Sequence, residues 1–122
     1  MEDKIKNKEL VNYFFQMMGD ERFLIVLEKY ASGEGYGIEH VWSVFADDYE
    51  GWEEDYFGDE GIAFYFDYPA VNEDKEVILD YETLYIYLKE IAESYLIRHP
   101  ESALEVDNYM NKIKERYIMD KK

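Results

Sequence analysis

Cysteine is absent from this chain of 122 residues, and proline occurs only twice. Without cysteine there can be no disulfide, no thiolate metal site and no thiol catalysis. No apolar run approaches the roughly 20 residues that a membrane-spanning helix needs. The N-terminus, MEDKIKNKEL, also lacks the apolar core of a secretory signal. We therefore expect a cytoplasmic protein that does not enter a membrane.

Basic residues are scarce as well, with 13 Lys and Arg against 29 Asp and Glu, for a net charge of -16. Phosphate backbones and anionic membrane surfaces are bound through Lys and Arg, so neither is an expected partner. Low hydrophobicity with high net charge can signal disorder, but 48% of these residues are apolar and 18% are aromatic. The length suits one hydrophobic core, so we expect a single folded domain over residues 1–122.

The negative charge is concentrated in one part of the chain. Residues 47–82 hold 14 acids and one base, whereas residues 1–46 hold 8 acids and 5 bases, and residues 83–122 hold 7 of each. The densest part is the acidic segment, residues 47–60, which has eight carboxylates and no base. Those carboxylates belong to Asp47, Asp48, Glu50, Glu53, Glu54, Asp55, Asp59 and Glu60.

Aromatic residues are interleaved with these carboxylates: Trp52, Tyr56 and Phe57. Large aromatics on a hydrated loop are expected where a partner or the core covers them, and they often dominate binding energy. We predict that the acidic segment binds a basic protein, with the eight carboxylates acting electrostatically and with Trp52 and Tyr56 as anchors. A solvated loop without a partner is the simpler alternative.

Divalent metal binding is a rival use of the acidic segment. The common calcium loop has alternating oxygen ligands with glycine at its sixth position, but counting from Asp48 the sixth residue is Glu53. An irregular metal site, or a metal-dependent enzyme built on it, stays open as an alternative. A third possibility is a nucleic-acid mimic that binds a DNA-binding protein.

No catalytic signature is present in the sequence. His40 and His99 are isolated; we expect the first to lie in a strand and the second to cap a helix end. We expect the glycines of 33–37 to form a turn, because they lack both the spacing and the lysine of a phosphate loop. No serine lies in a G-x-S-x-G context. We expect a protein that is not an enzyme and needs no cofactor.

Hydrophobic spacing predicts helices over about 7–18, 21–31 and 81–98, and a last helix that begins near Pro100. Gly19 should end the first helix, and Asp20 and Asp80 are plausible N-caps. Ser102 and Glu105 have the spacing of a capping box.

Strands are predicted over about 38–46, 61–68 and 76–80, the last two as an antiparallel hairpin. In the second strand, Ile62, Phe64, Phe66 and Tyr68 should face the core, while Tyr65 and Asp67 form a polar face that could extend the binding surface. The predicted fold class is α+β: a small antiparallel sheet of about three strands, with two N-terminal and two C-terminal helices.

The C-terminal half also carries a resemblance. It consists of Gly61–Phe66, Glu76–Asp80, Tyr81–Leu88, the stretch Tyr95–Glu101 with its His-Pro break, and Lys112–Tyr117. This order resembles the small bacterial immunity proteins of contact-dependent growth inhibition (CDI) systems, known as CdiI, particularly those that neutralise ribonuclease toxins. The resemblance implies a cytoplasmic antidote that binds the toxin domain of a delivered effector and blocks its nuclease site. It fixes no individual functional residue.

The charge distribution agrees with that implication. A ribonuclease presents Lys, Arg and His to an RNA backbone, so an inhibitor that covers its site is best made negative. Complementary charge raises association rates to about 10⁸–10⁹ M⁻¹s⁻¹ at low salt. We therefore predict one-to-one binding of a cognate basic nuclease, with Asp47, Asp48, Glu50, Trp52, Glu53, Glu54, Asp55, Tyr56, Asp59 and Glu60 at the interface.

Overall fold

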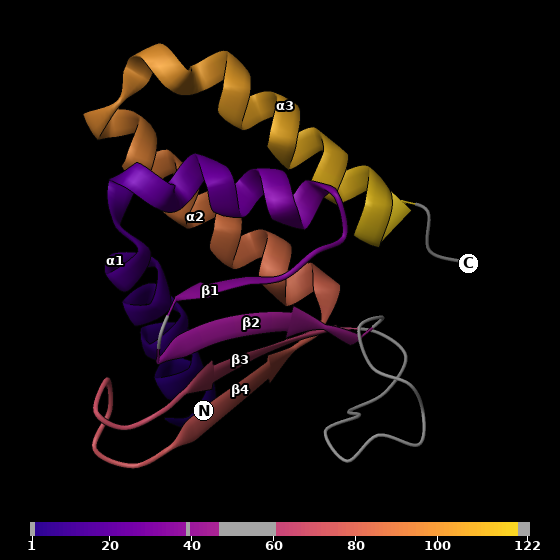
Figure 1. Cartoon of the computed structure of the whole chain (residues 1–122). Helices are drawn as coiled ribbons and strands as arrows, with labels where there is room; N and C mark the ends of the chain where they lie inside the picture. The colour runs from indigo at the N-terminus through magenta and orange to yellow at the C-terminus, as the bar shows by residue number, and fades with distance from the viewer. Residues whose placement is uncertain (1, 39, 47–60, 120–122) are drawn as a thin grey trace.

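The computed structural model of the chain describes residues 2–38, 40–46 and 61–119. It is an α+β structure in which helices pack on one side of an antiparallel sheet (Figure 1), so the predicted fold class is confirmed. The elements in chain order are α1 (Glu2–Ala31), β1 (Tyr36–Ile38), β2 (Val41–Phe45), β3 (Ile62–Phe66), β4 (Lys75–Leu79), α2 (Tyr81–Arg98), the 3₁₀ turn η2 (Pro100–Ser102), α3 (Ala103–Lys114) and the π-helical turn η3 (Glu115–Met119).

The sheet has four strands in the order β1-β2-β3-β4, rather than the three expected from the sequence. Every neighbouring pair is antiparallel, which confirms the predicted β3–β4 hairpin. The predicted strand over 38–46 corresponds to β2, while Ile38 is the last residue of a separate strand, β1. His40 lies in the turn before β2 rather than in a strand.

The additional strand, β1, lies in a glycine-rich stretch that the sequence suggested was only a turn. A Cβ atom on Gly37 would stand 2.1 Å from Cβ of Trp42, and one on Gly35 would stand 2.0 Å from the carbonyl oxygen of Ser43. The backbones of β1 and β2 therefore approach so closely that side chains at these positions would collide. Glycine permits this strand pairing rather than preventing it.

Helix α1 runs on through both predicted N-terminal helices but is kinked at Gly19, whose φ of 75° and ψ of 168° are not helical. The positive φ is easily adopted by glycine, so the predicted break is in the right place. Figure 1 shows the two halves of α1 pointing in different directions. The prediction that Asp20 is an N-cap is wrong, because its carboxylate is directed to residues of α2, as described below.

The ends of the C-terminal helices agree with most of the sequence signals. Asp80 caps α2: its Oδ1 accepts a hydrogen bond of 2.7 Å from the Thr83 backbone N–H. The helix ends at His99, before Pro100, and the His99 backbone N–H donates to the Tyr95 carbonyl. Ser102 precedes α3 but makes no side-chain capping bond, so the predicted capping box is not formed.

The core lies between the inward face of the sheet and the helices. Phe64 of β3 packs edge-on against Phe14 of α1, with ring centroids 5.0 Å apart, and both side chains are fully buried. Ile62 and Phe66 share this buried face, as predicted, but Tyr68 does not. Tyr68 lies beyond the end of β3 and is 69% exposed, because the sheet that would align it with the core has already ended.

Ser43 is the buried polar residue of the described core. Its hydroxyl lies 2.7 Å from the Tyr30 hydroxyl of α1 and donates to the Tyr36 carbonyl of β1 at 3.0 Å. Ser43 occupies an inward-facing position of β2, where an apolar residue is usual. Its hydroxyl group links the short strand β1 to both β2 and α1.

Candidate functional site

The ten residues predicted to bind a partner all belong to the acidic segment and lie outside the described residues. The structure does describe where that segment leaves and rejoins the fold. It connects β2 to β3, and a backbone hydrogen bond of 3.0 Å from the Ala46 N–H to the Gly61 carbonyl joins its two ends. The acidic segment is therefore an insertion in a β-hairpin whose strands are held in register through Phe45 and Ile62.

The topology divides the charge-rich stretch 47–82 between opposite ends of the sheet. Asp67, Glu73 and Asp74 lie in the β3–β4 connection, at the end of the sheet away from the acidic segment. Asp80 and Glu82 follow β4, at the end where the acidic segment departs. The stretch that is continuous in sequence is therefore not one continuous surface in the fold.

The outward face of the sheet, opposite the helices, begins next to the ends of the acidic segment. We use this name for the outward-pointing residues of the four strands, which are Gly37, Trp42, Val44, Ala63, Tyr65, Glu76 and Ile78. The Trp42 and Tyr65 rings lie 5.5 Å apart across β2 and β3, and Ile78 is 46% exposed. Tyr65 lies on the face opposite the core, as predicted, with Glu76 beside it in register. The aromatic and aliphatic residues of the other positions make this face less polar than the sequence suggests.

On the other side of the molecule, an open groove of about 560 Å³ separates α1 from α2. It is lined by Asn12, Phe15, Gln16, Gly19, Asp20, Phe23, Glu90, Ile91, Ser94, Tyr95 and Arg98. Charged side chains on its rim pair with one another or with neighbouring residues: Arg98 with Asp20 at 2.9 Å, and Glu90 with Lys8 at 2.7 Å. The groove thus presents little uncompensated charge to a basic partner.

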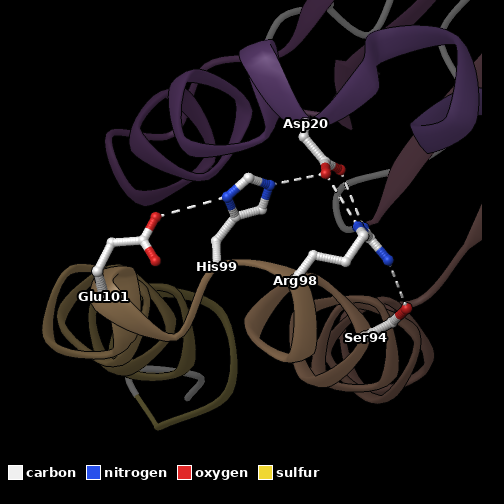
Figure 2. Close-up of polar contacts among 5 residues, drawn as sticks. All are labelled: Asp20, Ser94, Arg98, His99 and Glu101. Atoms are coloured by element: carbon white, nitrogen blue, oxygen red, sulfur yellow. Dashed lines mark hydrogen bonds and ion pairs between the residues drawn. The ribbon is translucent and has the colours of Figure 1, made fainter.

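Three residues that line this groove, Asp20, Ser94 and Arg98, belong to a polar network that also includes His99 and Glu101 (Figure 2). The Arg98 guanidinium donates to both Asp20 oxygens at 2.9 Å and to the Ser94 hydroxyl at 3.0 Å. His99 Nε2 lies 2.8 Å from Asp20 Oδ2, and its Nδ1 lies 3.5 Å from Glu101. The bonds from Arg98 and then from His99 lower the Asp20 pKa to about 2.

This network connects residues nearly 80 positions apart and fixes the kink of α1 against the end of α2. The sequence predicts Asp20 and His99 separately, as caps of two helices, and gives no sign of their contact. The one available signal was that both residues stand beside helix breaks. A sequence pattern cannot show that two such breaks meet in space.

Neither histidine belongs to a metal site in the described structure. Within residues 2–38, 40–46 and 61–119, no group of three or more His, Asp or Glu side chains could hold a metal ion. In the same ranges, no helix has both the length and the apolar character needed to cross a bilayer. The acidic segment, which carries the metal alternative, lies outside these residues.

Comparison with known families now adds to this geometry. A family model described as CDI immunity protein matches residues 7–110, which is most of the chain. The chain belongs to this family. The match covers α1, the whole sheet and α2, and continues into α3, so it extends well beyond the C-terminal half on which the sequence resemblance was based. No curated protein matches the chain in sequence.

Membership of the CDI immunity family gives the chain a toxin-neutralising role, in which an immunity protein binds a cognate toxin. The site that follows from this role is a protein-binding surface. The groove between α1 and α2 and the outward face of the sheet are two described surfaces that could take this role. The charges on the rim of the groove are paired, whereas the outward face begins beside Ala46 and Gly61, the described residues that flank the acidic segment.

Proposed function

We propose that this immunity protein neutralises a nuclease toxin, most simply a ribonuclease, by binding its basic catalytic surface one-to-one through the acidic segment. The observation that carries the proposal is the concentration of eight carboxylates, with no base, in a hairpin insertion of a CDI immunity protein. A nuclease must hold phosphates with cationic side chains. Carboxylates can occupy the same positions and exclude the RNA.

The charge of the acidic segment affects the rate of association with the toxin as well as the affinity for it. Opposite charges steer two proteins together, and association then reaches about 10⁸–10⁹ M⁻¹s⁻¹ at low salt. An antidote must bind before the toxin cleaves many RNA molecules, so fast association has a direct benefit. Trp52 and Tyr56 would supply buried aromatic contacts, and such contacts act mainly on dissociation.

The described fold supports this location in two ways. Asp80 and Glu82 add negative charge at the end of the sheet where the acidic segment begins. The charges on the rim of the groove between α1 and α2 are already paired, so that groove is a weaker candidate for a basic partner.

Association kinetics test the electrostatic part of the proposal. The probe is the C-terminal toxin domain of the effector encoded immediately upstream, purified in a catalytically inactive form. The test variant neutralises four carboxylates of the acidic segment: Glu53→Gln, Glu54→Gln, Asp55→Asn and Asp59→Asn. The control removes the same charge from exposed helix positions: Glu93→Gln, Glu105→Gln, Asp107→Asn and Glu115→Gln.

We expect the test variant to associate at least about tenfold more slowly at low salt, and to show a weaker dependence on salt. The control variant should stay close to the wild type, because its charges lie on the helices. Equal association rates for the test and control variants would show that the acidic segment is not the electrostatic contact.

The class of toxin is tested separately with RNA. The active toxin domain is incubated with total RNA, with and without an equimolar amount of the immunity protein. We expect RNA cleavage by the toxin alone and protection at a one-to-one ratio. Cleavage of DNA instead of RNA, or no cleavage of either, would overturn the ribonuclease assignment while leaving the immunity role in place.

A further inference from the structure

The outward face of the sheet has an unusual composition for a surface. In an antiparallel sheet covered by helices on one side, the other side is commonly polar. Here the row nearest Ala46 and Gly61 is Val44, Ala63 and Ile78, of which Ala63 is fully buried and Val44 is half-buried. The next row contains Trp42 and Tyr65, which are also half-buried. Ile78 is 46% exposed, although its neighbours Val77 and Leu79 are buried in the core.

Charge on this face has one sign. Among its described positions the ionised residue is Glu76, which is exposed and paired in register with Tyr65. Lys75 is on the opposite face of the sheet, because it is paired in register with Phe66, whose side chain enters the core. A partly exposed aromatic and aliphatic surface whose ionised side chain is the carboxylate of Glu76 complements a partner that is itself basic.

Position in the hairpin makes this face continuous with the acidic segment. Val44 and Ala63 are each within two residues of Ala46 and Gly61, where the segment begins and ends. Ile78 lies beside Ala63 in the neighbouring strand. A protein that binds close to Ala46 and Gly61 therefore lies at the end of the sheet where this row is located.

We propose that the outward face of the sheet, through Trp42, Val44, Ile78 and Glu76, is a second part of the surface that binds the basic toxin domain. This inference rests on the proposed function and extends it. The acidic segment provides the long-range attraction, and the outward face provides the apolar contact area that slows dissociation.

The test compares matched variants on the two sides of the molecule. Ile78→Arg places a long cation on the outward face, and Ile97→Arg places the same cation on α2, where Ile97 is 83% exposed. Glu76→Lys and Glu93→Lys form a second matched pair at exposed positions. The partner is the inactive toxin domain used above, and circular dichroism melting curves identify any variant that is not folded.

We expect Ile78→Arg to weaken binding at least about tenfold relative to Ile97→Arg, mostly through faster dissociation. Glu76→Lys should likewise weaken binding more than Glu93→Lys. Each pair has the same net charge, so the difference within a pair reports position and not total charge.

Two kinds of failure are distinguishable. If the wild type binds tightly, the acidic-segment variant associates slowly and both matched pairs behave alike, the outward face is not part of the interface and only this inference is overturned. If the wild type does not bind the toxin domain, or the acidic-segment variant associates like its control, the proposed function itself is overturned.

Discussion

The buried contact between Tyr30 and Ser43 leads to an asymmetric prediction about stability. The two hydroxyls are 2.7 Å apart, and Tyr30 is fully buried. Ser43 has a single hydroxyl proton, which it donates to the Tyr36 carbonyl at 3.0 Å. Tyr30 must therefore be the donor to Ser43. Burial also raises the Tyr30 pKa well above its usual range, so this hydroxyl keeps its proton at neutral pH.

Removing one partner is consequently not equivalent to removing the other. Tyr30→Phe deletes a hydrogen-bond donor, while Ser43 keeps its bond to the Tyr36 carbonyl. The free energy of unfolding should therefore fall by about 1 kcal/mol. Ser43→Ala leaves the Tyr30 hydroxyl buried without its acceptor and also removes the bond that holds β1. We expect that variant to lose about 2–3 kcal/mol. The double variant should lose less than the sum of the single variants, because their effects share one bond.

Urea unfolding at pH 7, followed by circular dichroism, measures these free energies from the midpoint and the slope. The slope should be the same in all variants if the compactness of the native state is unchanged. A larger loss in Tyr30→Phe than in Ser43→Ala would contradict the assigned direction of the hydrogen bond. Simple additivity in the double variant would show that the two hydroxyls are not coupled.

Three further predictions concern side chains that the fold places at critical points. Asp20→Asn should lower the free energy of unfolding by about 1 kcal/mol at pH 7. This value is reduced for solvent screening, because the Asp20 side chain is 38% exposed. Since the folded pKa of about 2 lies below the unfolded value, this stabilisation is present above about pH 4 and is lost as pH falls toward 2. Urea unfolding of both proteins between pH 7 and pH 3 checks this, and a constant difference would contradict it. Gly37→Ala should cost about 1–3 kcal/mol because its Cβ would collide with Trp42; an unchanged midpoint would argue against the close strand approach. Asp80→Ala should cost about 1 kcal/mol through loss of the α2 cap, with Asp80→Asn largely retaining it; equal losses in the two variants would count against a capping role.

Local signals in the sequence predicted the elements whose formation depends on nearby residues. The apolar spacing of 81–98, the Asp80 cap and the His99-Pro100 break together determine α2. Alternation over 62–66 and a short polar connection determine the β3–β4 hairpin. These predictions succeeded because helix capping, proline geometry and strand alternation act within a few residues.

The errors have a common cause, which is that a local pattern was contradicted by a distant contact. Glycines that normally end an element here permit β1, because β2 lies close enough to exclude side chains. Asp20 looked like a helix cap but binds Arg98 and His99 on another helix. Tyr68 continued the alternation of β3, yet the strand that would have buried it had already ended.

The sequence by itself determined the fold class, the large negative charge and the concentration of that charge in residues 47–82, because these follow from composition and short-range periodicity. Only the tertiary structure decided how the charge is distributed in space. Antiparallel pairing places the β3–β4 connection at one end of the sheet. It places Ala46 and Gly61, which flank the acidic segment, at the other end, next to the apolar residues Val44 and Ile78 of the outward face. Strand pairing joins residues far apart in sequence, so no local pattern could have shown which charges and which apolar residues would become neighbours.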